Sequence, residues 1–222
     1  MSVQNADPAA TDCTFLVDLA EGKKLLPDPP IASIGYQASI VITPQQEADI
    51  DIKATLNNLL IPYTSNYAGT LLPGIREYTV TPGEKTTTIS GKGKAGLKQE
   101  ENYYFFYLPV CYKGITGKSY AYYNTSRSKN LYLPASVDEN YSYDIQLPEN
   151  LTLCTPIQEK KIDNPIGSFK ITLTSEGSSL HIELALQIKK QLITPAEYPA
   201  FRSLITEWTD RTRKPILFKT VQ

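Results

Sequence analysis

The amino-acid sequence predicts an all-β protein, β-sandwich-like in architecture, with one α-helix near the C-terminus. Three observations lead to this class: long runs alternate apolar and polar residues, turn residues separate the runs, and only one stretch has a helical apolar stripe. The 222 residues include 15 Tyr, 16 Pro and 12 Gly. Tyr and β-branched residues favour strands, and Pro and Gly favour turns.

The clearest alternation runs through residues 168–193. Phe169, Ile171 and Leu173 are separated by polar residues, and a second alternating run starts at Leu180 after a turn that contains Gly177. A period of two places one apolar face and one polar face on each strand. Two such runs joined by a short turn with glycine predict a β-hairpin.

Other runs show the same alternation or a strand-like composition. They predict a hairpin from two runs, a second pair of strands, a central strand covered on both faces, an alternating strand and a closing strand. In that order the ranges are 35–43 with 48–56, 76–81 with 86–90, 102–111, 141–147 and 214–220.

A helix is predicted near residues 195–209. Thr194 is a suitable N-cap, Pro195 suits the first helical position, and Glu197 completes a capping box. The apolar residues Tyr198, Phe201, Ile205 and Trp208 then recur at helical spacing and form one stripe.

Proline clusters and composition divide the chain into three predicted parts. Residues 1–30 form an N-terminal segment, residues 31–115 a first β subdomain, and residues 116–222 a second, β-sandwich-like subdomain that carries the helix. The boundary near residue 30 follows from the proline cluster at 27–30, which ends regular structure.

Charge and hydropathy exclude several classes of partner. The formal net charge is −1, so no global basic field for nucleic acid is expected. No apolar run approaches the roughly 20 residues that span a bilayer, and residues 1–15 lack the pattern of a signal peptide. Whether Met1 is the native start, or begins a fragment of a longer exported chain, stays open.

The cysteines do not define a cofactor or metal site. Cys13, Cys111 and Cys154 are odd in number and far apart, so they form neither a disulfide framework nor a metal-ligand spacing. Whether any two of them pair stays open. No cofactor and no metal site are expected from the sequence.

Two sequence motifs are interpreted as structural. Residues 91–96 spell G-x-G-x-x-G, but no helix follows, so a loop is expected rather than a dinucleotide site. His181 is the sole histidine and lies on the polar face of a predicted strand without an adjacent nucleophile motif. No catalytic residue is therefore predicted.

The abundant tyrosines leave two interpretations open. Tyr offers an apolar face and a polar tip, which suits a sugar- or peptide-binding groove, but it also suits packing within a β-sheet. The packing interpretation is favoured for the tyrosines within strand-like runs. The candidate binding surface comprises Tyr120, Tyr122, Tyr123, Arg127 and Tyr132.

The C-terminal half resembles a known family. The matching features are Asn124 and Arg127, the segments 131–134 and 143–148, the hairpin, and the segments 195–202 and 216–219. They resemble the C-terminal β-domain, of uncharacterised function, of bacterial three-part transglutaminase-like proteins. The resemblance covers residues 120–222 well and residues 31–119 loosely.

The resemblance implies a non-catalytic piece of a larger protein. Residues 15–30 look like the last strands of a transglutaminase core, where Asp28-Pro29 matches the context of the triad's acidic residue. The motifs around the catalytic cysteine and histidine have no counterpart here. The implied function is an accessory or interaction domain, periplasmic or otherwise exported, with its own core as partner and a protein or peptide partner as a further option.

Two alternatives belong to other classes. The first is a carbohydrate- or peptide-binding module that uses Tyr-rich strands, and it should show a contiguous exposed aromatic patch. The second is an enzyme of another type, which should show titratable groups that converge in a cleft.

Overall fold

The structure is a computed structural model of the whole chain. It describes residues 30–45, 47–57, 75–111, 115, 126–133 and 135–221. The predicted N-terminal segment, residues 1–30, lies outside these ranges except for Pro30.

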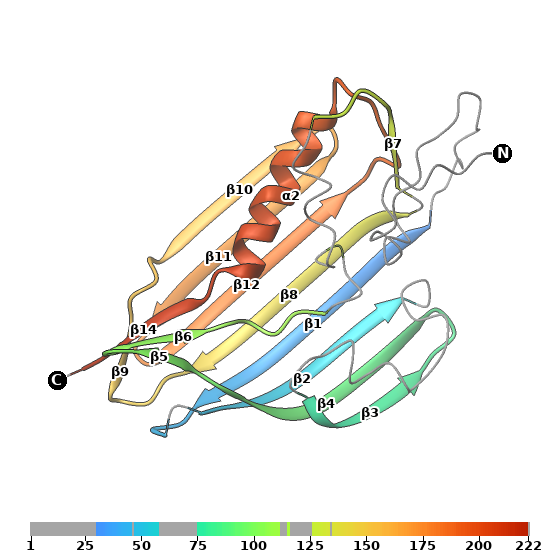
Figure 1. The fold of residues 1–222 in the computed structure, drawn as a ribbon. Helices are drawn as coiled ribbons and strands as arrows, with labels where there is room; N and C mark the ends of the chain where they lie inside the picture. Colours follow the sequence, from blue (N-terminus) through green and yellow to red (C-terminus); the bar gives the residue numbers. More distant parts are fainter. Residues whose placement is uncertain are drawn as a thin grey trace.

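A large mixed sheet dominates the fold (Figure 1). Its eight strands run in the order β10-β11-β12-β8-β1-β2-β4-β3. Their bounds are β1 Ile31–Ile42, β2 Glu47–Asn57, β3 Ile75–Pro82, β4 Thr86–Gly96, β8 Ser136–Gln146, β10 Gln158–Asn164, β11 Gly167–Glu176 and β12 Ser179–Ile188. The predicted mainly-β class is therefore confirmed.

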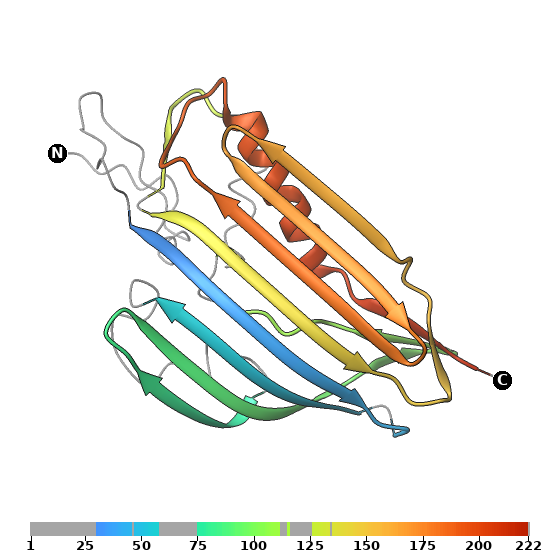
Figure 2. The ribbon, with the colours of Figure 1, turned by 180° about the vertical axis from the view of Figure 1, so that it is seen from behind.

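A second layer covers one side of this sheet (Figures 1 and 2). It contains a four-stranded sheet in the order β5-β6-β14-β9 and, among the described residues, one helix, α2. No helix in this part of the chain is long and apolar enough to cross a bilayer. The bounds are β5 Lys98–Glu100, β6 Tyr103–Phe106, β9 Leu151–Leu153, β14 Ile216–Thr220 and α2 Tyr198–Arg213, with a two-stranded pair of β7 Leu131–Tyr132 and β13 Leu192–Ile193.

Alternation in the sequence explains why only one face of the large sheet is covered. Along β1, every second residue from Ala32 to Ile42 is buried, while Ser39 and the residues in phase with it are mainly exposed. β2 and β12 repeat the pattern. The opposite face, which Figure 2 shows without a covering layer of described elements, is polar and is called here the open face.

The hairpin predicted in residues 168–193 is confirmed as β11 and β12. Its antiparallel register pairs Phe169 with Leu186 and Ile171 with Leu184, so the apolar residues share the covered face. Gly177 in the turn has a φ of 59°, in the left-handed region where glycine avoids the steric cost of a side chain. The hairpins formed by β1 with β2 and by β3 with β4 are also as predicted.

The centre of the sheet is a parallel pair that the sequence did not reveal. β1 pairs with β8 in parallel, from Ile31 opposite Ser136 to Val41 opposite Gln146. Strands from residues 31–115 and from residues 116–222 therefore belong to one sheet. The division into two β subdomains at residue 115 stays a prediction about folding units.

The expectation of a central covered strand over residues 102–111 was wrong. Only Tyr103–Phe106 form a strand, β6, and it lies in the four-stranded sheet between β5 and β14. Leu108 and Cys111 are nevertheless buried. The dense apolar character of this stretch thus comes from crossing the covered face of the large sheet.

Residues 91–96 are strand, so the loop interpretation of the G-x-G-x-x-G motif was wrong. They form the second half of β4 and pair with β2. A Cβ atom on Gly91 would lie 2.6 Å from Ile75 Cγ2 and 2.7 Å from the Glu77 carbonyl oxygen. Gly91 therefore accommodates the bulge in β3 between Ile75 and Glu77.

The predicted helix is confirmed, with later bounds. Thr194 and Glu197 do interact: the backbone N–H of Thr194 donates to Glu197 Oε2 at 3.1 Å and its hydroxyl donates to the same oxygen at 3.0 Å. These contacts close a turn before the helix, which begins at Tyr198 and runs to Arg213. Glu197 is the N-cap, so the prediction of Thr194 as N-cap and of Pro195 at the first helical position was wrong. Pro199 lies in the first turn, where a missing N–H costs little.

Trp208 anchors α2 on the large sheet. Its side chain is completely buried, and its ring centroid lies 5.6 Å from that of Tyr141 on β8 and 6.4 Å from that of Phe169 on β11. The apolar stripe predicted for this helix therefore packs on β11, which belongs to the predicted hairpin, and on β8.

We expect Trp208→Ala to lower the free energy of unfolding by about 3–5 kcal/mol, because the truncation removes buried aromatic area and leaves a cavity. Urea titration followed by circular dichroism measures this change. Tyr107→Ala is the matched control, since Tyr107 is 55% exposed. An unchanged midpoint for Trp208→Ala would contradict the docking of α2.

Candidate functional site

Two of the five predicted binding residues lie in the described part of the chain. Tyr120, Tyr122 and Tyr123 fall outside the described residues. Tyr132 is half-buried on β7 and pairs with Leu192 of β13. Arg127 lines a groove beside α2, whereas Tyr132 does not belong to the lining of this groove.

The groove lies between the first half of α2 and β10. Tyr198 and Ile162 belong to its apolar lining, and Pro195 and Pro199 extend that lining at the start of the helix. Arg202, Ser203 and Thr206 contribute polar groups from the flank of α2. The volume of this open groove is about 390 Å³, which is enough for one or two side chains of a ligand.

Two guanidinium groups flank the aromatic residue of the groove. Arg127 Cζ lies 5.9 Å from the centroid of the Tyr198 ring, within the range of a cation–π interaction. Burial raises the pKa of Tyr198, while the positive charges of Arg127 and Arg202 act in the opposite direction. Both positive charges therefore act on the Tyr198 side chain.

An ion pair limits the other end of the groove. Lys160 Nζ of β10 donates to Glu207 Oε1 of α2 at 2.6 Å. A second link joins the same two elements, because Asn164 Nδ2 donates to the Ala200 carbonyl oxygen at 3.1 Å. These bonds hold β10 at a fixed distance from the helix, so the groove is built into the fold.

Sequence reasoning missed most of this groove because it missed β10. The strand reads QEKKIDN. Ile162 is its only apolar residue, so no alternation of apolar and polar residues is visible in the sequence. Charged residues like those of β10 are typical of an edge strand. The helix side of the groove could have been predicted, because Arg202 and Thr206 are polar residues outside the apolar stripe of the predicted helix.

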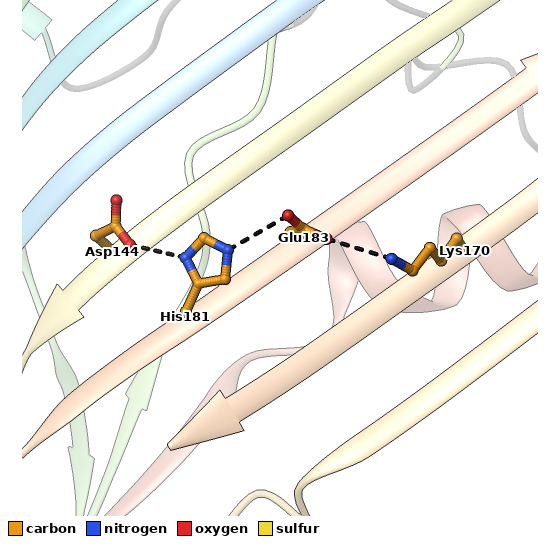
Figure 3. A network of polar contacts seen from close by, with 4 residues as sticks. All are labelled: Asp144, Lys170, His181 and Glu183. Atoms are coloured by element: carbon orange, nitrogen blue, oxygen red, sulfur yellow. Dashed lines mark hydrogen bonds and ion pairs between the residues drawn. The ribbon is translucent and has the colours of Figure 1, made fainter. Parts of the chain in front are cut away.

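His181 lies on the open face within a row of charges (Figure 3). Its Nδ1 is 2.7 Å from Asp144 Oδ1, and its Nε2 is 3.5 Å from Glu183 Oε1. Lys170 Nζ donates to Glu183 Oε2 at 3.4 Å. The prediction of His181 as a surface strand residue agrees with this position.

A shallow hollow lies beside His181 at the end of the open face. Its volume is about 330 Å³, and Ser39, Asp144, Thr174 and Glu176 help to line it. The carboxylates make it acidic. Among the described residues, no group of three His, Cys, Asp or Glu side chains is arranged to hold a metal ion.

We expect Asp144→Asn to lower the pKa of His181. The hydrogen bond to the Asp144 carboxylate is the largest cause that raises this pKa above its usual 6.5, followed by the bond to Glu183. Proton NMR titration of the imidazole measures the change directly. Asp138→Asn on the same strand is the matched control, because Asp138 pairs with Gln187 rather than with His181.

A buried carboxyl group lies on the covered face. Glu139 is 2% exposed and follows the phase of Tyr141 and Tyr143 along β8. It accepts hydrogen bonds from the backbone N–H of Ile115 and, at 3.3 Å, from the Tyr141 hydroxyl. Burial raises the pKa of Glu139 from 4.5 to about 7, although these two bonds oppose the shift.

This raised pKa links stability to pH. The folded protein holds the Glu139 proton more tightly than the unfolded chain, so its stabilising effect is complete below pH 4.5 and is lost as the pH rises to 7. We expect Glu139→Gln to stabilise the protein at pH 8 by roughly 3 kcal/mol relative to the unmodified chain, and by little at pH 4.

Urea unfolding at both pH values measures this difference. Glu149→Gln, at an exposed position after β8, is the control and should leave the pH dependence unchanged. Equal effects of Glu139→Gln at pH 4 and pH 8 would contradict a buried, titrating carboxyl group.

The described tyrosines and cysteines are mainly packing residues. Tyr36, Tyr104, Tyr141 and Tyr143 are at most 4% exposed, as the packing interpretation predicted for strand tyrosines. Cys111 is completely buried beside them, Cys154 is half-buried, and these two do not pair with each other. Tyr112 lies outside the described residues.

These features define a mixed β-sheet domain with one packed helix, an open polar face and a helix-flanking groove. The chain belongs to the family described as Domain of Unknown Function with solved structure, DUF3858. The family profile matches residues 102–218, more than half of the chain. This region contains α2, β10 and the whole groove.

One solved structure is similar. It is a crystal structure at 2.00 Å resolution of a protein from Parabacteroides distasonis ATCC 8503, provisionally described as a protease. The identity is 31% and the TM-score is 0.50, over 55% of this chain and 24% of that chain. The match thus spans about a quarter of that protein's length. No curated protein matches this chain.

Proposed function

We propose that this chain is a non-catalytic accessory domain of a bacterial transglutaminase-like protein that is exported in its longer form. The observation that carries the proposal is the similarity to 24% of a longer chain at 31% identity. A domain that recurs as a minor part of a larger protein acts together with the remainder of that protein. The description of the longer protein as a protease is compatible with a papain-like core, since both concern amide bonds.

The placement of the described nucleophiles supports the non-catalytic part of the proposal. A transglutaminase-type reaction requires a thiolate, a base that accepts its proton and a group that orients the base. His181 faces the open side of the large sheet, whereas Cys111 is buried on the covered side. These two side chains lie on opposite faces of the sheet.

The described residues give no comparable support to the alternative of a binding module built on Tyr-rich strands. Its strand tyrosines 36, 104, 141 and 143 are inside the core. Of the exposed described tyrosines, Tyr78 lies on β3 of the large sheet, Tyr103 on β6 of the four-stranded sheet and Tyr107 directly after β6.

The test has two measurements. Antibodies against this domain should detect a native bacterial protein larger than 24.7 kDa, whose sequence, read by mass spectrometry, contains a cysteine–histidine–acid core. The isolated chain should not hydrolyse or transfer amide groups in a peptide library. A native product of 24.7 kDa would contradict the accessory role, and turnover that His181→Ala abolishes would contradict the non-catalytic role.

A further inference from the structure

We infer that the groove between β10 and α2 binds an extended acidic peptide segment, which adds to the large sheet as a further strand beside β10. The groove has an apolar floor, a cationic rim and an open sheet edge along one side. The inference concerns the groove alone and does not depend on the proposed parentage of the domain.

The open edge of β10 provides main-chain recognition. Among the described strands, β10 is the terminal strand of the large sheet and pairs with β11 alone. In an antiparallel pair, the outer strand directs every second set of backbone N–H and C=O groups away from its partner. An extended peptide satisfies such groups by strand addition, and pockets for its alternate side chains provide specificity.

The register of β10 shows which side chains of the added strand would enter the groove. Ile162 pairs with Phe169, which is buried on the covered face, so Lys160, Ile162 and Asn164 face the helix. A strand beside β10 therefore presents every second side chain to the flank of α2, about 7 Å apart. That flank carries Arg202.

These spacings predict an apolar residue and an acidic residue two positions apart in the peptide. The apolar side chain contacts Ile162 and Tyr198 on the floor of the groove. The acidic side chain reaches Arg202, which is exposed and makes no hydrogen bond or ion pair to a described residue, and the guanidinium of Arg127 lies over the same tyrosine.

The local charges favour an acidic ligand over a basic one. Glu207 is the sole carboxylate that lines the groove among the described residues, and Lys160 pairs with it at 2.6 Å. Arg202 adds an exposed positive charge to the rim. A carboxylate that meets a guanidinium group forms strong, directional hydrogen bonds.

The probes are two heptapeptides, Ac-STVTETS-NH2 and Ac-STVTKTS-NH2, which differ only in the acidic or basic residue two positions after the valine. Titration into the ¹⁵N-labelled full chain is followed by amide chemical shifts. We expect the first peptide to shift amides of β10 and of the first half of α2 in a saturable way. The second peptide should bind at least about tenfold more weakly, because it lacks the charged hydrogen bonds.

A charge-swap variant separates recognition from any effect on folding. Arg202→Glu should reverse the preference, so that the lysine peptide binds more tightly than the glutamate peptide. Lys85→Glu is the matched control: it changes the net charge equally, at an exposed site in the turn beside β3, the opposite edge of the sheet. It should retain the preference for glutamate.

Three outcomes would overturn the inference. The first is the absence of shifts with the glutamate peptide at millimolar concentration. The second is shifts confined to the open face, on β1, β8 and β12. The third is an unchanged preference in Arg202→Glu.

Discussion

The structure depends on how three polar groups of β8 are satisfied inside the core. Glu139, Tyr141 and Tyr143 all face the covered side of the sheet, where unpaired polar atoms carry a large desolvation cost. Backbone groups of the segment after β6 meet them: the Ile115 N–H donates to Glu139, and the Tyr143 hydroxyl donates to the Pro109 carbonyl oxygen at 2.7 Å. This segment must therefore cross the sheet at β8. The neighbouring surface over β11 is covered by α2 instead. The helix docks there through Trp208, which contacts Phe169.

The same arrangement separates two surfaces with different chemistry. On the covered side, a groove lies between the first half of α2 and the terminal strand β10. On the open side, strands of full length present rows of charged and polar side chains, such as the row through His181. Exposed ion pairs of this type add little stability, because water screens them and ordering the side chains costs entropy. The open face thus tolerates substitution, whereas the geometry of the groove depends on bonds between β10 and α2.

Local patterns predicted the elements well, and long-range partners poorly. The alternation of Phe169, Ile171 and Leu173 was enough for the hairpin, because hairpin strands are adjacent in sequence. The parallel pairing of β1 with β8 could not be predicted in this way, since no local sequence pattern specifies which distant strand lies beside another. Arg127 was predicted as a binding residue, but Arg202 and Ile162, which line the same groove, come from elements far along the chain. The burial of Glu139 could have been predicted from the sequence. Extending the alternation of Tyr141 and Tyr143 by two residues towards the N-terminus places Glu139 inside the core.

The parallel pair at the centre of the sheet has a consequence for synthesis on the ribosome. β1 is complete early, but Ile31 meets Ser136 only after the intervening residues have left the exit tunnel. Until then, the hairpins of β1 to β4 expose an unpaired apolar strand edge, and closing so long a loop is slow compared with hairpin formation. Nascent chains that stall before β8 therefore present a surface that chaperones recognise and that other chains can pair with. The order of translation, as well as the final packing, determines how safely this sheet is assembled.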